Sequence, residues 1–531
     1  MTQFRAVTQS ENGANAQGFF IDIFLFSILI AGILFWYLPF SFVPVTGDDI
    51  VNLSLFETHQ MYSDWRQILF GSPFAKYRPV FGAIFYVFAS IFGRDFQSYL
   101  LLNVAIQLLT TFLVASIIFY VSRSRLQAWC AAVCFAFARF AYYQMWQGIG
   151  GMLEGLALFM LLSSLLLFMM AIQRRSEGQF AAAALVLGLC TFTHERYIVC
   201  FFPAILLLAT YGDSDFLPVR GRLRLIALYA VIAISNPLLK TFVAKSQFFV
   251  GTGGKFIEFN APQIIHFFLS AVANTLGINV GDSYLSSEDF VLAPLPIKIL
   301  SGAICVVTVG VIVLGLIRSM DFRKIGSIFI DKNIALVSIV AFFCLAMTAS
   351  ITFRQEYRWI YSPYIFLIVL IFSIISKFLP RKPGALISIL LVSLSIPHDL
   401  YYRIRNYHNL YFMAWMQPLP TSFEMVQEIQ RTVLNYGPKE VYVGQAFNAQ
   451  ASGDNGVWLA VTGDPVCGAV YIDDTKVPAR CVPDGAGGGS VSFAMPKKYT
   501  ETPSQHVITF VDQFGRAWAP VVFKVNPAPT P

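Results

Sequence analysis

About eleven apolar segments of spanning or nearly spanning length constrain the fold of this chain more than any other feature. They lie at 19–42, 97–121, 126–145, 152–172, 180–193, 196–211, 224–243, 294–317, 333–351, 358–376 and 384–397. A helix needs about 20 apolar residues to cross the hydrocarbon core of a bilayer, so the shorter segments are near the lower limit. Because 56% of the residues are hydrophobic and only 13% are charged, we expect a polytopic α-helical membrane protein. Nothing in the composition indicates a nucleic acid partner.

The connections between these segments carry five basic clusters, which predict the orientation of the chain. The clusters are Arg123/Arg125, Arg174/Arg175, Arg220/Arg222/Arg224, Arg318/Arg323/Lys324/Lys332 and Lys377/Arg381/Lys382. Cytoplasmic loops are enriched in Lys and Arg. If the segment 78–92 crosses the bilayer, all five clusters fall outside unless the N-terminus is external. If it lies in the interface or re-enters, all five fall inside.

We favour the second topology because the segment 78–92 is only about fifteen residues long. It gives about 11 transmembrane helices with a cytoplasmic N-terminus and an external C-terminus. Residues 1–18 are polar and lack the apolar core of a signal peptide, so 19–42 is expected to remain as the first span. The membrane part is then 1–399, with external loops at 43–79 and 244–293.

The first external loop carries the acidic pair Asp48 and Asp49 directly after the first span. Keeping two carboxylates beside hydrocarbon is costly, so the pair is a candidate site. The alternative is that Asp48 caps the following helix. Later in the loop, Lys76 and Arg78 precede Pro79. They either extend from that helix toward the membrane surface or bind a phosphate, to which arginine presents a planar set of donors.

Two further polar stretches interrupt apolar runs on the same expected face. Three ionisable residues within such a run are too costly to have no role. The first stretch is His194-Glu195-Arg196, for which the alternative is a salt bridge between Glu195 and Arg196 that closes a tight turn. The second stretch contains Arg354, Glu356, Tyr357 and Arg358.

Beyond residue 399 the composition becomes polar and rich in turn-forming residues. We expect a helical connector at 400–436, a small extracytoplasmic β-sandwich at 437–525 and a disordered tail at 526–531. Strands are predicted at 440–443, 457–461, 469–472, 491–493, 507–511 and 521–525. Cys467 and Cys481 are the two cysteines of this region, and a disulfide between them fits an oxidising exterior.

The order and sidedness of these motifs resemble the GT-C superfamily of polytopic membrane glycosyltransferases. That superfamily includes the protein O-mannosyltransferases and the lipid A aminoarabinose transferases. The resemblance covers about the first 400 residues. It is carried by Asp48-Asp49, Tyr77-Arg78-Pro79, His194-Glu195-Arg196 and Glu356-Tyr357-Arg358-Trp359.

The resemblance implies a GT-C-like fold and inverting transfer of a sugar from a polyprenyl-phosphate donor to a glycan, lipid or protein acceptor outside the cytoplasm. It implies that Asp48, or as second choice Asp49, is the general base that activates the acceptor. The donor phosphate would be bound by Lys76, Arg78, Arg196, Arg354 and Arg358, while His194, Glu195, Glu356 and Tyr357 would orient the substrates. No cofactor or metal is required, although Glu154, Asp282, Glu288 and Asp289 leave room for a divalent cation.

Three other functions are compatible with many spans and external charges. A transporter or flippase of a lipid-linked sugar would be expected to place ionisable residues near the bilayer midplane, often in internal repeats. A polymerase or ligase that acts on diphosphate-linked glycans would use similar chemistry. A binding or assembly protein would use the C-terminal β region as its working part.

Overall fold

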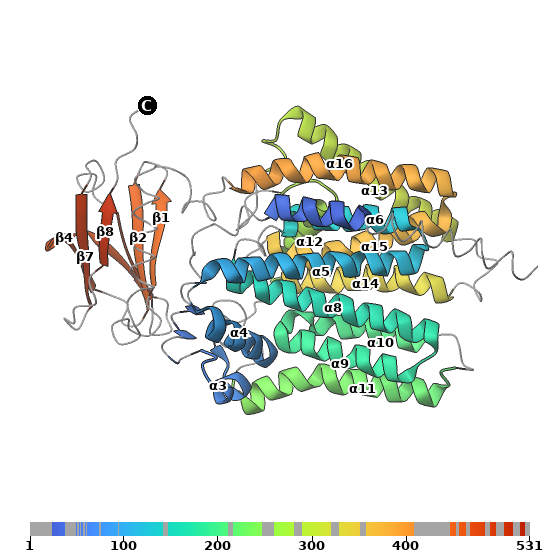
Figure 1. Cartoon of the computed structure of the whole chain (residues 1–531), viewed down its shortest axis with the longest axis horizontal. Helices are drawn as coiled ribbons and strands as arrows, with labels where there is room; N and C mark the ends of the chain where they lie inside the picture. Colours follow the sequence, from blue (N-terminus) through green and yellow to red (C-terminus); the bar gives the residue numbers. More distant parts are fainter. Residues whose placement is uncertain are drawn as a thin grey trace, which may run out of the picture.

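The structure is a computed structural model that consists of a helical bundle and a C-terminal β region (Figure 1). It describes residues 24–37, 49, 52–53, 55–56, 59, 61–73, 76–93, 95–141, 147–210, 216–246, 260–280, 289–319, 329–350, 357–407, 446–452, 456–463, 468–483, 489–494, 504–512 and 521–525.

Six helices in this part of the chain are long and apolar enough to cross a membrane. They belong to α5 (Phe96–Ser122), α8 (Gly148–Arg174), α11 (Val219–Leu238), α13 (Leu295–Ser319), α15 (Tyr361–Phe378) and α16 (Arg381–Tyr407). Shorter apolar helices are Phe24–Tyr37, α4 (Pro79–Phe92), α9 (Glu177–Thr193) and Val337–Thr348 within α14 (Phe329–Ser350). A helical membrane protein is therefore supported. The described residues contain six helices of spanning length, so the number of eleven spans stays a prediction.

The bundle is built around α15, which is the most deeply buried of these helices. Of its most apolar window, 89% is buried, whereas the corresponding value for α11 is 17%. A helix that is apolar on all sides needs neighbours on all sides. α5, α6 (Arg125–Ala136), α14 and α16 all pack against α15. α15 therefore lies at the centre of the bundle, while α11 lies at its periphery.

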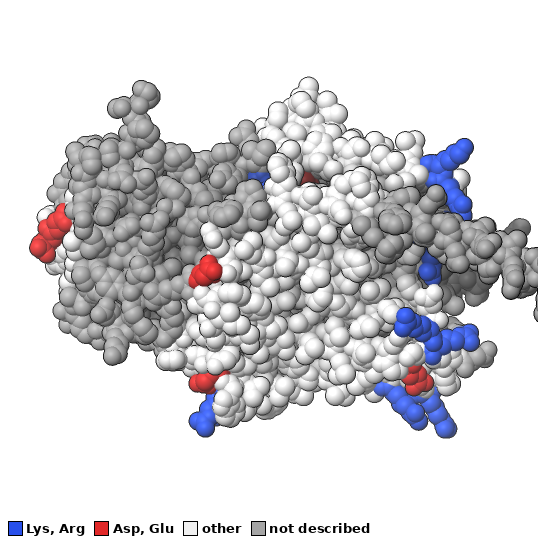
Figure 2. All heavy atoms as spheres, viewed as in Figure 1, with Lys and Arg blue, Asp and Glu red and all other residues white. Residues whose placement is uncertain are grey.

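Two tight turns with the same local sequence bring basic residues to one end of the bundle. α5 and α8 each end at an arginine with positive φ, Arg123 (54°) and Arg175 (50°). The next residue in each case is a serine whose hydroxyl caps the following helix, α6 or α9. Tyr120 Oη, near the end of α5, donates to the Met169 carbonyl near the end of α8 at 2.7 Å. Most of the Lys and Arg side chains visible in Figure 2 lie at this end.

α4 does not run the length of the bundle. Its first residue follows Arg78, which is bonded to Glu195 beyond the end of α9. Its last residue is followed closely by α5, and Asn103 of α5 donates to the Gln147 carbonyl before the start of α8. Both ends of α4 therefore lie at the end of the bundle opposite the basic turns. The preceding helix α3 (Trp65–Phe70) packs against α4.

Two predicted spans have different bounds in the structure. The span expected at 126–145 is interrupted, because α6 ends at Ala136 and a 3₁₀ turn, η3 (Arg139–Ala141), follows. Arg139 is buried and donates to Asp399 Oδ1 at 2.9 Å and to the Asn274 carbonyl at 2.6 Å. Asp399 belongs to α16, which continues through Pro397 to Tyr407. The boundary expected at 399–400 therefore falls inside a helix, because Arg139 neutralises a carboxylate there.

The span expected at 196–211 also differs. It begins with a 3₁₀ turn, η4 (Glu195–Cys200), and continues as α10 (Phe201–Thr210). The remaining helical elements are α12 (Ala261–Thr275), the π-helical turn η5 (Leu239–Val243) and the 3₁₀ turn η8 (Tyr357–Ile360).

The C-terminal region contains two four-stranded antiparallel sheets with strand orders β1-β2-β6-β5 and β4-β3-β7-β8. The strands are β1 (Ala446–Ser452), β2 (Gly456–Gly463), β3 (Gly468–Ile472), β4 (Thr475–Val477), β5 (Ala479–Pro483), β6 (Gly489–Ala494), β7 (Ser504–Asp512) and β8 (Val521–Val525). Five predicted strands coincide with β2, β3, β6, β7 and β8. β1, β4 and β5 were not predicted, and the sixth predicted strand, 440–443, lies outside the described residues.

Candidate functional site

The candidate site is built on η4, where the chain turns from α9 into α10. His194 has an extended backbone (φ −146°) and ends α9, and its own N–H donates to the Cys190 carbonyl at 2.8 Å. Its ring then caps η4, because Nδ1 accepts the Arg196 backbone N–H at 3.3 Å. The turn therefore holds three consecutive ionisable side chains at one end of the bundle.

Arg78 and Glu195 form the first ion pair of the site. Arg78 Nε donates to Glu195 Oε2 at 2.5 Å and Arg78 Nη2 to Glu195 Oε1 at 2.8 Å, so the contact is bidentate. The Arg78 side chain is 10% exposed and that of Glu195 is 32% exposed. Burial would raise the pKa of the Glu195 carboxyl, but the positive charge of Arg78 holds that pKa well below its usual value. Glu195 is therefore ionised at neutral pH.

Arg196 and Glu154 form the second ion pair. Arg196 Nη2 donates to Glu154 Oε2 at 2.7 Å, and its guanidinium lies 5.3 Å from the centre of the Tyr197 ring. Glu154 projects from the second turn of α8 and is 2% exposed. The Nε and Nη1 atoms of Arg196 are buried and have no hydrogen-bond partner among the described residues. Arg196 thus has donors left for a ligand.

His194 connects the two pairs. Its Nε2 lies 3.4 Å from Glu154 Oε1, and its Nδ1 lies 3.7 Å from Glu195 Oε2. Burial, and next the positive charge of Arg78, lower the pKa of His194 to about 4. The imidazole is therefore neutral at pH 7, and the positive charge of the site comes from its arginines and lysines.

This lowered pKa predicts a pH-dependent stability. Above pH 6.5 the ring is neutral in both the folded and the unfolded chain, so it contributes nothing. As the pH falls from 6.5 to about 4, the unfolded chain binds a proton that the folded chain does not, and the protein loses up to about 3 kcal/mol of stability. The melting temperature of the detergent-solubilised protein should therefore fall more steeply over this range than that of the His194→Gln variant. Equal slopes would contradict the lowered pKa.

Of the acidic pair Asp48 and Asp49, the structure describes only Asp49. Asp49 is fully buried and accepts backbone N–H groups at the start of α8: Gly148 to Oδ2 at 2.9 Å, Ile149 to Oδ1 at 3.0 Å and Gly150 to Oδ1 at 3.2 Å. This arrangement anchors the loop to the positive end of the helix dipole. Asp48 lies outside the described residues.

Three more cations lie within electrostatic range of the ion pairs. Lys76 acts on Glu195, and Arg358 acts on Glu154 and Arg196. The third is Lys240, on which Glu195 and Arg78 act. It was missed in the sequence because it stands alone in an apolar segment. It is 4% exposed in η5, three residues after Pro237. The π-helical turn that holds Lys240 is visible only in the structure.

The remaining predicted residues are only partly described. Arg354, Glu356 and Cys467 lie outside the described residues, so the expected disulfide stays a prediction. Tyr357 opens η8 and Cys481 lies in β5, but their side chains are not described. Among the described residues, no group of three or more His, Cys, Asp or Glu side chains is suited to hold a metal ion.

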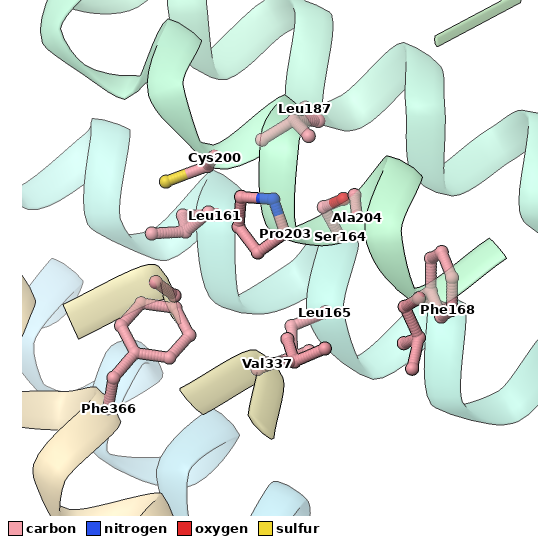
Figure 3. Close-up of a pocket in the computed structure, with 12 residues that line it drawn as sticks. Leu161, Ser164, Leu165, Phe168, Leu187, Cys200, Pro203, Ala204, Val337 and Phe366 are labelled. Carbon is pink, nitrogen blue, oxygen red and sulfur yellow. The ribbon is translucent and has the colours of Figure 1, made fainter. Parts of the chain in front are cut away.

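An apolar cavity lies deeper in the bundle, between α8, α9, α10, α14 and α15 (Figure 3). The cavity volume is about 40 Å³. Its lining begins at Cys200, the last residue of η4, and also includes Leu161, Leu165, Phe168, Val337 and Phe366. A hydrocarbon chain fits such a lining.

Comparison with known proteins adds no relative, since no protein-family model and no curated protein matches this chain.

Proposed function

We propose that this protein is an integral membrane glycosyltransferase that moves a sugar from a polyprenyl-phosphate donor to an acceptor outside the cytoplasm, with inversion at the anomeric carbon. The observation that carries the proposal is the Arg196–Glu154 pair beside the Arg78–Glu195 pair. Together they form a buried ionic site in which one arginine still has donors to offer.

The position of the site supports a lipid-linked substrate. Glu154 and Arg174 are both in α8, separated by twenty residues or about 30 Å of helix, close to the thickness of the hydrocarbon core. The ionic site and the basic turns would therefore occupy opposite membrane surfaces. By the positive-inside rule, the site would face away from the cytoplasm.

The arginines account for the departure of the lipid phosphate. Negative charge grows on the phosphate oxygens as the bond to the sugar breaks, so fixed cations stabilise the transition state more than the ground state. Arg196 would donate through Nε and Nη1, while Glu154 holds its guanidinium in place. Lys76, Arg78, Arg354 and Arg358 would add positive charge. The apolar side chains around Cys200 would contact the first isoprene units of the carrier.

Asp48 would act as the general base. Because both Asp49 oxygens already accept N–H groups of α8, Asp49 would position the loop rather than take a proton. Asp48 would remove the proton from the acceptor hydroxyl as that oxygen attacks the anomeric carbon. His194, Glu195, Glu356 and Tyr357 would orient the two substrates.

A donor panel tests the proposal. Purified protein in nanodiscs is mixed with a cell-envelope extract as acceptor and with prenyl-phosphate sugars, prenyl-diphosphate sugars or nucleotide sugars in turn. The leaving group of each donor is measured, namely prenyl phosphate, prenyl diphosphate or nucleotide. We expect release from at least one phosphate-linked donor and none from nucleotide sugars. Release from diphosphate-linked donors alone would instead indicate the polymerase or ligase. Translocation of intact donor across vesicles, without release, would indicate the flippase.

A further inference from the structure

Close to the ionic site, α5 carries two buried polar residues that each have a side-chain atom without a hydrogen-bond partner among the described residues. Asn103 and Gln107 are each 1% exposed and lie one turn apart, on the same side of the helix. Within the part of the chain that the structure describes, Asn103 Oδ1 and Gln107 Nε2 have no hydrogen-bond partner. Buried polar side chains inside a membrane bundle are expensive and tend to be functional. Neither residue was selected from the sequence, because both lie in an apolar segment of spanning length.

The unmet atoms do not depend on how the amides are turned. Asn103 Nδ2 donates to the carbonyls of Gln147 and Gly148 at 2.9 and 3.0 Å, so the free atom of Asn103 must be its oxygen. The hydroxyl of Tyr361 occupies only one of the two polar atoms of the Gln107 amide. One acceptor on Asn103 and one atom on Gln107 therefore remain available.

These residues adjoin the ionic site. Tyr361, the partner of Gln107, lies within electrostatic range of Tyr197 and Glu154. On the facing helix α8, a side chain added at Gly155 would come 3.0 Å from Ile106 Cγ2, so the Gln107 turn of α5 lies against the Glu154 turn of α8. Arg196, whose Nε and Nη1 also lack a partner in the described part of the chain, bonds Glu154 Oε2 through Nη2 at 2.7 Å.

The set of unmet groups defines the kind of ligand they would accept. Arg196 offers donors, Asn103 offers an acceptor, and the carboxylate of Glu154 is bonded to Arg196. A cation would be repelled by Arg196, and a second anion would meet Glu154 and the Asn103 oxygen. A hydroxyl satisfies both kinds of partner, because it donates and accepts. The stacked rings of Phe135 and Tyr361, 5.2 Å apart, lie beside Gln107.

We infer that Asn103 and Gln107 form a binding site for the hydroxyl groups of the donor sugar, next to the phosphate-binding arginine. This inference rests on the proposed function and extends it, since it assigns residues that would choose between sugars. Arg196 would bind the phosphate of the glycosylated lipid and of the sugar-free lipid alike. Only the glycosylated lipid would form additional hydrogen bonds to Asn103 and Gln107 of α5.

The test measures the affinity of the protein in nanodiscs for sugar-free prenyl phosphate and for prenyl phosphates that carry glucose, galactose, mannose or N-acetylglucosamine. Wild-type protein should bind at least one glycosylated lipid about tenfold more tightly than the sugar-free lipid, the effect of one buried hydrogen bond or slightly more. Gln107→Met keeps the length of the side chain and removes its polar atoms. It should abolish that preference and leave the affinity for sugar-free prenyl phosphate unchanged.

Thr110→Val is the matched control, because Thr110 is buried to the same extent on α5 and its hydroxyl is satisfied by the Ile106 carbonyl at 2.7 Å. It should keep the preference. If the Asn103 and Gln107 atoms are satisfied by water alone, Gln107→Met will retain the wild-type preference or wild type will show none, and the inference is overturned while the proposed function stands. Failure of wild type to bind any of these lipids would overturn both.

Discussion

The Asp48→Asn variant is expected to transfer sugar about 100- to 10 000-fold more slowly than wild type, with normal membrane insertion. The amide has nearly the same shape as the carboxylate but cannot take a proton, and general base catalysis is worth about that factor. The measurement is the rate of prenyl phosphate release at saturating donor. The affinity for the donor should change little, because the proposed phosphate ligands are elsewhere.

Two other substitutions in the same loop serve as controls. Asp64→Asn changes an exposed N-cap, where Asp64 Oδ1 accepts the N–H groups of Arg66 and Gln67 at 2.7 and 2.9 Å, and it should leave the rate unchanged. Asp49→Asn should lower the melting temperature, because it weakens the anchor at the start of α8, and the protein that remains folded should stay active. Full activity in Asp48→Asn would remove Asp48 from the role of base.

Arg196→Met should destabilise the protein by about 3–5 kcal/mol, the typical effect of removing one partner of a buried ion pair. The Glu154 carboxylate, 2% exposed, would lose the guanidinium that bonds it at 2.7 Å. The measurement is chemical or thermal unfolding in detergent. The exposed Arg66 provides the control, since Arg66→Met should change the stability by no more than about 0.5 kcal/mol.

The double variant Glu154→Gln/Arg196→Met separates a structural from a ligand-binding role of Arg196. It removes the buried charge together with its partner, so most of the lost stability should return. Its affinity for prenyl phosphate should stay low, because the donors on Nε and Nη1 are gone. Recovery of both stability and affinity would mean that Arg196 serves only to neutralise Glu154.

The sequence predicted those features that depend only on neighbouring residues, such as the free-energy cost of placing charged side chains in an apolar segment. Three ionisable residues in an apolar run indicated the His194–Arg196 turn, and the alternation of strands with turn residues indicated five of the eight described strands. The alternative that a salt bridge between Glu195 and Arg196 closes this turn was wrong. Glu195 instead pairs with Arg78, and Arg196 pairs with Glu154.

Contacts that join distant segments were not predictable. Arg139 and Asp399 compensate each other 260 positions apart, and neither charge marks the end of a span when its partner is unknown. Lys240 and Gln107 were missed for a similar reason. Mean hydropathy is calculated over a window of residues, and the apolar neighbours of these two side chains dominate that mean. The count of about eleven spans stays a prediction, because 3₁₀ turns such as η4 interrupt apolar runs that composition alone presents as continuous.

The central claim is that the Arg78 and Arg196 ion pairs bind the phosphate of a membrane-embedded carrier lipid. Photo-crosslinking tests it most directly, with a prenyl phosphate that carries a diazirine on its first isoprene unit and mass spectrometry of the labelled peptides. The account predicts crosslinks to residues of η4 and to α10 near Cys200, reduced by unlabelled prenyl phosphate and by Arg196→Met. Labelling at the opposite end of the bundle, around Arg174 and Arg175, with none at η4, would contradict it.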